Sequence, residues 1–324
     1  MARFEPDHCP HPDCKDATSF RCQRHGTYRR ACDGREVQRF RCQSCLHTFS
    51  VQTFRFDYRH RKPRINHLLL NAFVSKNTQR QASRTFRLNR KTIAHRLELM
   101  GRHCELYHRR ALDAAPSLAF LDAFALDELE TFEKDRVNMP LTMPMLVSRH
   151  TLFILDFEVG TLPPRGRKPA GLVRHARRSQ SSEAVLAILQ RAAKLGAPER
   201  AVPACFATDK KTTYPGLIQR AFGGRASHTQ VDAQLPRTSQ NPLFAVNLTF
   251  AMLRDGISRL VRRNWGHSKL AAKLVRHAWI WVAWRNYVRI RTVRTPGETA
   301  ATAAMIAKRP VKPMELMRER LVWD

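Results

Sequence analysis

Four cysteines near the N-terminus have the residue type and the spacing of a metal site. Cys9 and Cys14 form one close pair, and Cys42 and Cys45 form a second pair further along the chain. Thiolates bind Zn²⁺ tetrahedrally, and two close pairs separated by a longer segment are typical of a structural four-thiolate site. We therefore predict that these four residues bind a structural zinc ion. The alternative is four ordinary buried thiols.

Other potential ligands lie close to the same cysteines. His11 and His47 fall inside or next to the two pairs and could each replace a thiolate. Four thiolates already complete a tetrahedral site, so the histidines stay outside the predicted ligand set. We interpret Cys22 and Cys32 as core thiols or weak alternative ligands.

Two aspartates follow apolar segments that have the composition of β-strands. Asp127 comes after Ala125 and Leu126, and Asp209 comes after Ala207 and Thr208. An aspartate where a strand ends can point into the crevice that α/β sheets use for ligands. Two such carboxylates on neighbouring strands can hold Mg²⁺ for phosphodiester chemistry. The alternative is that each aspartate only caps a turn.

The charge of the chain points to a polyanionic partner. Lys and Arg number 57 against 27 for Asp and Glu, which gives a formal net charge of +30. Such an excess favours nucleic acid through counterion release. Apolar residues make up 43% of the 324 residues, enough for a sizeable core. The start carries no signal-peptide pattern, and no apolar run reaches the roughly 18 residues of a membrane span. We expect a cytoplasmic protein that binds nucleic acid and no membrane.

The elements that must position these residues change character along the chain. Residues 1–60 are predicted to form short strands around zinc, and residues 61–112 show the spacing of three helices. Helix, short helix, turn and longer helix is the helix-turn-helix pattern. The third helix starts after Asn89, and its first turns suit the major groove of DNA. The alternative is a helical hairpin with a solvated basic face. The predicted DNA contacts of the third helix are Arg90, Lys91, Thr92, His95 and Arg96.

Residues 116–292 read as mixed α/β. Strands come first, then helix, strand, helix, strand and two further helices, at about 242–263 and 270–288; this is the order of an RNase H-like domain. The predicted fold class is therefore α+β multidomain: a zinc ribbon, a helix-turn-helix and an RNase H-like domain with a mixed sheet. Residues 293–324 form a C-terminal tail with no readable role.

The ordered motifs resemble a bacterial insertion-sequence transposase of the DDE type, nearest to the "insertion element one" family. The resemblance spans residue 9 to about residue 290. The motifs that carry it are the two cysteine pairs with Arg41-Cys42-Gln43-Ser44-Cys45 and Thr48-Phe49, the helix-turn-helix pattern, Leu126-Asp127-Glu128-Leu129, Thr208-Asp209-Lys210-Lys211-Thr212-Thr213-Tyr214, Val246-Asn247-Leu248-Thr249, Arg259-Leu260-Val261-Arg262-Arg263 and Ser268-Lys269.

The resemblance implies a specific activity. It implies a protein that binds the terminal inverted repeats of a mobile element, cleaves the DNA at the element ends and transfers the freed 3′-hydroxyl into target DNA. Asp127 and Asp209 would be the ligands of catalytic Mg²⁺ or Mn²⁺. The partner would be double-stranded DNA, on which we expect a homo-oligomer associated with the bacterial nucleoid.

The chain departs from the family pattern at the third acidic position. The family places a glutamate three residues before Asn247, and here that residue is Phe244. Asp255 would lie about 16 Å further along a helix, too far to share ions with the two aspartates. Asp232 is an outside candidate. Asn247 is the preferred substitute because its amide oxygen can coordinate Mg²⁺, and Arg254 lies on the same helical face, where it could contact a phosphate.

The missing glutamate leaves other functions open. Asn247 could instead only cap or pack, in which case the chain would be a catalytically inactive relative or a sequence-specific DNA-binding regulator. A third class is a zinc protein that binds RNA. These alternatives differ in whether the chain cuts DNA and in which nucleic acid it prefers.

Overall fold

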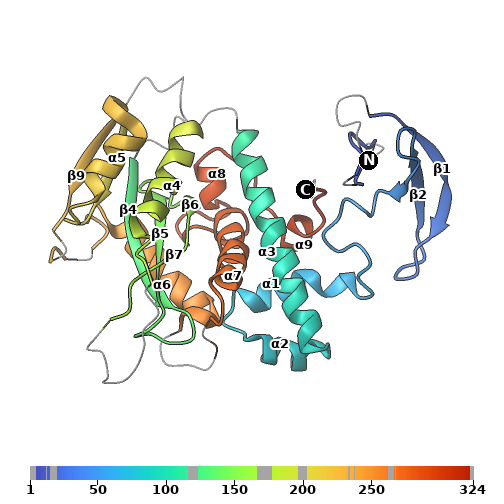
Figure 1. The fold of residues 1–324 in the computed structure, drawn as a ribbon, viewed down its shortest axis with the longest axis horizontal. Helices are drawn as coiled ribbons and strands as arrows, with labels where there is room; N and C mark the ends of the chain where they lie inside the picture. The colour runs from blue at the N-terminus through green and yellow to red at the C-terminus, as the bar shows by residue number, and fades with distance from the viewer. Residues whose placement is uncertain are drawn as a thin grey trace. The chain divides into compact units, whose positions relative to one another are not determined.

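The computed structural model describes residues 5–11, 13–14, 20–115, 123–165, 177–195, 203–232, 234–236, 238–261, 266 and 268–321. The chain divides into two compact units (Figure 1). The first comprises Met1–Leu70 together with Pro313–Asp324, and the second comprises Asn71–Lys312. The division falls inside the first α-helix, so most of the predicted helix-turn-helix belongs to the same unit as the large sheet.

The first unit contains a small antiparallel sheet with the order β1-β2-β3. Its strands are β1 (Cys22–Arg29), β2 (Glu36–Cys42) and β3 (Thr48–Ser50). Phe40, Phe49 and Phe54 pack together with Cys42 as its core. This core is small for an independently stable module, which is the situation in which small domains add a metal. The short helix α9 (Pro313–Leu316) belongs to the same unit.

The three predicted helices of the helix-turn-helix are present. They are α1 (Asn66–Phe73), α2 (Gln79–Phe86) and α3 (Arg90–Asp113). Local side chains start the second and third helices. The Thr78 hydroxyl accepts from the Gln81 N–H at 3.2 Å in a capping box, and Asn89 Oδ1 accepts from the Lys91 N–H at 2.8 Å. Arg87, with φ 48°, closes α2 in the left-handed conformation that ends many helices.

The long helix α3 packs closely on α7 (Ala271–Ala283) within the second unit. A Cβ atom added to Gly101 would lie 2.4 Å from the carbonyl oxygen of Arg276, so the two backbones meet where only glycine fits. The Arg276 guanidinium donates to Glu98 at 3.2 Å and to Glu105 at 2.5 Å. A close backbone contact and two ion pairs therefore join the predicted recognition helix to α7.

We expect Gly101→Ala to lower the free energy of unfolding by about 1–3 kcal/mol, because the added methyl group overpacks the contact between α3 and Arg276. Gly216→Ala is the matched control. Gly216 lies inside α5 (Tyr214–Phe222) with no atom within 4 Å of an added Cβ. Alanine there should be neutral or stabilise by up to about 1 kcal/mol. Urea unfolding followed by tryptophan fluorescence measures both; equal stability of the two variants would contradict the close contact.

The large sheet of the second unit is mixed. Its strand order is β6-β5-β4-β8-β9, with β7 paired to β5. The β6, β5 and β4 strands pair antiparallel, whereas β4, β8 and β9 pair parallel. This mixed arrangement is consistent with the predicted RNase H-like domain. The strands are β4 (Ala123–Phe132), β5 (Pro140–Ser148), β6 (Ile154–Phe157), β7 (Gly160–Thr161), β8 (Ala204–Thr208) and β9 (Ala226–Gln230).

Helices flank this sheet in Figure 1: α4 (Ser181–Leu195) packs against β5 and α5, and α6 (Phe244–Gly256) packs against β4 and β5. A π-helical turn, Trp284–Val288, continues α7 and is followed by α8 (Ala300–Ala303). Asn286 in this turn accepts from the Ile154 N–H at 3.0 Å and donates to the Ile154 carbonyl at 2.9 Å. The Asn286 side chain thus makes the two backbone hydrogen bonds that a neighbouring strand would make at Ile154. It covers part of the free edge of β6.

The helix predicted for residues 242–263 is shorter than expected. It ends at Gly256, where an added Cβ would lie 2.5 Å from Nε1 of Trp281 on α7. The chain turns there into a short 3-10 helix, Ser258–Leu260, and residues 262–263 lie outside the described part. Within the described chain, every helix is too short or too polar to cross a bilayer.

Candidate functional site

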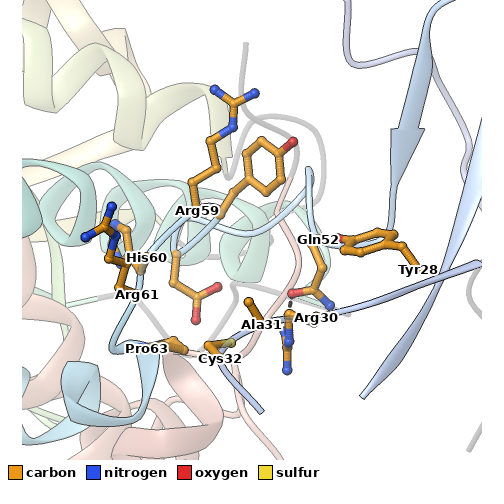
Figure 2. Close-up of a pocket in the computed structure, with 11 residues that line it drawn as sticks. Tyr28, Arg30, Ala31, Cys32, Gln52, Arg59, His60, Arg61 and Pro63 are labelled. Carbon is orange, nitrogen blue, oxygen red and sulfur yellow. Dashed lines mark hydrogen bonds between the residues drawn. The ribbon is translucent and has the colours of Figure 1, made fainter. Parts of the chain in front are cut away.

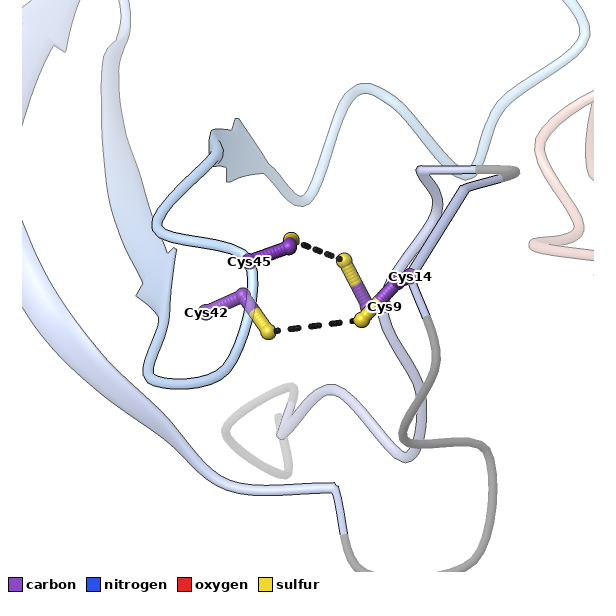
Figure 3. Close-up of side chains that lie close together, drawn as sticks. All are labelled: Cys9, Cys14, Cys42 and Cys45. Carbon is purple, nitrogen blue, oxygen red and sulfur yellow. Dashed lines mark hydrogen bonds between the residues drawn. The ribbon is translucent and has the colours of Figure 1, made fainter.

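The four predicted cysteine ligands come together in the first unit (Figure 3). The sulfur atoms of Cys9, Cys14, Cys42 and Cys45 all lie within 4.8 Å of one another. Cys9 is 3.6 Å from Cys45, and Cys14 is 3.8 Å from Cys42. Four sulfurs around a tetrahedral ion with Zn–S bonds of about 2.3 Å are about 3.8 Å apart, whereas disulfide sulfurs are about 2.05 Å apart. The cluster therefore fits a zinc ion and not a pair of disulfides.

The turn at the second cysteine pair favours the thiolate form of Cys42. Cys42 ends β2, and the chain turns back immediately through Cys45 and Leu46, whose φ is 62°. Burial raises the pKa of Cys42, but hydrogen bonds from the N–H groups of Cys45 and Ser44 outweigh it and lower the pKa to about 7. Thiolate is the form that binds metal. The local turn therefore supplies both the position and the charge state.

The remaining candidates in this unit stay outside the four-sulfur group. Cys22 lies directly opposite Cys42 in the sheet and packs against the phenylalanine core. The rings of His11 and His47 stack on each other with their centroids 3.6 Å apart. Cys32 lines a separate hollow (Figure 2). These placements agree with the interpretation of Cys22 as a core thiol.

The hollow in Figure 2 has a volume of about 550 Å³ and mixed charge. Arg30 is committed to Asp33 and to Gln52, at 2.8 Å and 2.5 Å. Asp57 is held by Arg55 at 2.7 Å. The two acids in and around this hollow, Asp33 and Asp57, are thus each paired with an arginine.

We expect the purified chain to contain one zinc ion, and Cys42→Ser to remove it. A structural zinc site contributes about 10–16 kcal/mol of apparent binding free energy, so the small core of the first unit should unfold without it. Cys32→Ser is the matched control because Cys32 belongs to the same unit but not to the cluster. Metal analysis and hydrogen exchange of residues 20–58 measure the effect. Retention of full protection after strong chelation would contradict a structural zinc ion.

The pairing of two parallel strands places Asp127 beside Asp209. The last paired residues of β4 and β8 are Ala125 and Ala207, and each aspartate follows its strand's last pair by two residues. Neighbouring strands lie about 4.8 Å apart, so the two carboxylates start from adjacent backbone positions. Burial, together with the charges of Asp209 and Glu128, raises the pKa of Asp127 to about 6. The structure thus brings these two predicted residues together.

The expectation that a strand ends at Asp127 is wrong. β4 continues to Phe132, and Asp127 is paired with Met145 of β5. Only β8 ends, at Thr208, just before Asp209. At Asp127, β4 is therefore no longer paired with β8 on one edge, while its other edge is still paired with β5. An apolar run predicts the start of a strand but not its end, because pairing with β5 carries this strand through polar residues.

A buried network around Glu128 was not foreseen from the sequence. The Glu128 carboxylate accepts from the hydroxyls of Thr142 at 2.5 Å, Ser181 at 2.8 Å and Tyr214 at 3.0 Å, and it forms an ion pair with Lys211. Lys211 also donates to the Ser181 hydroxyl at 2.7 Å. Tyr214 is only 1% exposed, so it packs in the core. The Glu128 carboxylate is therefore already bound by four partners. Glu128 does not take the place of the missing third acidic ligand.

This network fixes the loop that carries the second aspartate. Lys211 follows Asp209 by two residues, and its N–H donates to Asp209 Oδ1 at 3.1 Å. Glu128, next to Asp127 on β4, holds the side chain of the same lysine. The two aspartates are thus connected through a neighbouring ion pair. The sequence contains both Glu128 and Lys211, but no local pattern relates residues so far apart.

We expect Glu128→Gln to lower the free energy of unfolding by about 2–4 kcal/mol, because it leaves Lys211 without its buried counter-charge and disturbs three hydroxyl donors. Glu130→Gln is the control. Glu130 pairs with Arg165 on the surface, where both side chains are about half exposed. Loss of this surface ion pair should lower the free energy of unfolding by less than about 1 kcal/mol. Chemical denaturation compares the two variants, and equal effects would show that the network does not support this part of the sheet.

No third acidic residue joins the pair within the described chain. Of the described His, Cys, Asp and Glu side chains, only the cysteine cluster forms a group of three or more that could share an ion. Asp232 pairs with Lys210 at 2.7 Å. Asp255 pairs with Lys76 and its side chain is 82% exposed. Asn247 is half-buried in the first turn of α6, the helix that packs on β4 and β5.

The predicted DNA contacts differ in exposure. Arg90, Lys91 and His95 are exposed in the first turns of α3, and Thr92 is half-buried. Arg96 is only 3% exposed, because it lies on the same helical face as the buried residues Ile93, Leu97 and Met100. The expectation that Arg96 reads bases does not fit this burial. Arg254 is half-buried on α6.

Comparisons with known proteins find distant similarity to solved structures. No family model matches the sequence, and no curated protein matches it significantly. Among solved structures, the catalytic domain of Mos1 mariner transposase is similar over 58% of this chain and 85% of that chain. The identity is 12% and the TM-score is 0.30.

Proposed function

We propose that this chain is a DDE-type transposase that binds the terminal inverted repeats of an insertion element and catalyses DNA cleavage and strand transfer. The observation that carries the proposal is the position of Asp127 and Asp209 at the point where two parallel strands of a mixed sheet separate. Adjacent carboxylates repel each other, and a divalent cation bound between them removes this repulsion. The ordered motifs of the sequence support the same assignment.

The donor set fits Mg²⁺ or Mn²⁺. Proteins commonly hold Mg²⁺ with one or two carboxylates and leave its other positions to water and substrate phosphates. Asp127 and Asp209 would provide the carboxylates and Asn247 an amide oxygen. Bound divalent ions would supply activation of the attacking oxygen and stabilisation of the leaving oxygen. The residues of the chain hold this site in place through the Glu128–Lys211 pair.

The neutral third ligand has a consequence for metal affinity. Hard cations favour charged oxygen ligands, so an asparagine at position 247 would bind a second ion more weakly than a glutamate would. The protein would then need a higher free metal concentration for activity. The neighbouring Arg254 on α6 would contact a phosphate of the substrate.

The basic residues would provide the DNA contacts. Arg90, Lys91 and His95 are exposed at the start of α3, the part of a recognition helix that enters the major groove. Thr92 would add a polar contact, whereas the buried Arg96 would support the helix from behind. The zinc module would add a second contact region on double-stranded DNA. A homo-oligomer would bring the two element ends together.

We expect Asp127→Asn to reduce nicking of a plasmid carrying the coding region and its flanking DNA by at least about 100-fold, a loss typical of removing one charge-stabilising group. The assay contains Mg²⁺ or Mn²⁺, and a gel-shift assay confirms that DNA binding is kept. Asp255→Asn is the control: Asp255 is exposed and pairs only with Lys76 among the described contacts. This variant should retain wild-type nicking.

Two results would redirect the assignment. If wild type and Asp127→Asn bind the ends equally and both lack nicking, the chain is a DNA-binding regulator or an inactive relative. If structured RNA binds as tightly as duplex DNA, or more tightly, the RNA-binding alternative is favoured.

A further inference from the structure

A basic hollow lies entirely within the second unit. It has a volume of about 700 Å³ and is built from three segments that are distant in the sequence. The first is the turn before α2 with the start of that helix, the second is the start of α3, and the third lies between α6 and the beginning of α7. The polar and charged residues that line it are Asn77, Thr78, Gln79, Arg80, Arg90, Ser258, Arg259, Lys269, Lys273 and His277.

The charge of this hollow is one-sided. Five of its described lining residues are basic and none is acidic. Glu98, which is not among the lining residues, accepts from Lys273 at 2.5 Å and interacts electrostatically with Arg259. Burial lowers the pKa of Arg259. Burial, and then the charge of Arg259, lower the pKa of His277 to about 3, so this histidine adds no further charge. Clustered, partly desolvated cations of this kind are stabilised by a bound anion.

The hollow is fastened to the strand that carries the first aspartate. The backbone of Ser268 forms an isolated parallel β-bridge with that of Glu133, and the Ser268 carbonyl accepts from the Lys134 N–H at 2.8 Å. Glu133 also accepts from the Ala271 N–H at the start of α7 and pairs with Arg177 at 2.8 Å. The segment that bears Lys269 and Lys273 is therefore held directly at the end of β4.

The spacing along β4 relates the hollow to the aspartate pair. Glu133 lies six residues beyond Asp127, which corresponds to about 20 Å along a strand. That length equals about six base pairs of duplex at 3.4 Å each. Arg90 lies both in the wall of the hollow and in the first turn of α3. One duplex can therefore present its groove to α3 and its backbone to the hollow.

We propose that this hollow binds phosphate groups of the DNA backbone and thereby sets the distance between the bases read by α3 and the point of cleavage. The inference rests on the proposed function, because it takes the duplex bound by α3 as the substrate of the aspartate pair. Backbone contacts fix the register of a protein on DNA without reading its sequence. Arg80, Arg259 and Lys269 are positioning residues in this role.

The test compares two double variants that remove the same number of charges. Arg80→Gln with Lys269→Gln changes two exposed residues of the hollow, whereas Arg220→Gln with Arg294→Gln changes two exposed residues outside it. Affinity for end-containing duplex DNA is measured by fluorescence anisotropy between 50 and 300 mM salt. Each lost phosphate contact should reduce the magnitude of the slope of log K against log salt by about 0.9. The magnitude should therefore fall by about 1.8 for the hollow variant and by much less for the control.

Cleavage mapping at single-nucleotide resolution gives a second readout. The hollow variant should cut at several neighbouring positions, and the charge-preserving variant Arg80→Lys with Lys269→Arg should restore both the salt slope and a single cutting position. If the hollow variant matches the control in slope and in cutting position while wild type binds and cuts DNA, the phosphate site is wrong and the proposed function stands. If wild type does not bind duplex DNA, both fail.

Discussion

The parallel pairing of β4 with β8 is the interaction on which the candidate site depends. Its last pair joins Ala125 to Ala207, and beyond it the chain places Asp127 and Asp209 next to each other. Two adjacent carboxylates repel, so the surrounding structure must hold them. The ladder of hydrogen bonds, the stacked rings of Phe124 and Phe206 at 5.5 Å, and the burial of both strands oppose that repulsion. A parallel pair also requires a long crossover, which is why residues so distant in the sequence meet.

The few acidic residues of this basic chain are used to organise cations. Glu128 holds Lys211 beside the aspartate pair, Glu133 holds Arg177 and the start of α7, and Glu98 holds Lys273 and Arg276 between α3 and α7. Each of these carboxylates is at least partly buried, where unpaired charge is costly. With 57 basic residues against 27 acidic ones, many cations remain for contacts with a polyanion. Because the acidic residues are too few to pair with all of the basic ones, the remaining basic residues form the proposed DNA surfaces.

The two units reach stability by different routes. The first has a core of three phenylalanines and one cysteine around a cluster that fits zinc, so metal binding would replace the burial that the unit lacks. The second buries strands, tryptophans and the face of α3 around one mixed sheet. Its close contact at Gly101 links the helix that would read DNA to α7 in the same unit. Recognition and chemistry would thus share one packed framework.

The sequence alone determined the features that depend on neighbours within a few positions. These are the paired cysteines and the start of the third helix after Asn89, because spacing and capping act locally. Only the tertiary structure decided where β4 continues, where α6 ends against Trp281, that Arg96 is buried, and that Glu128 binds Lys211. Each of these depends on a contact between residues far apart in the chain, and local patterns carry no information about such contacts.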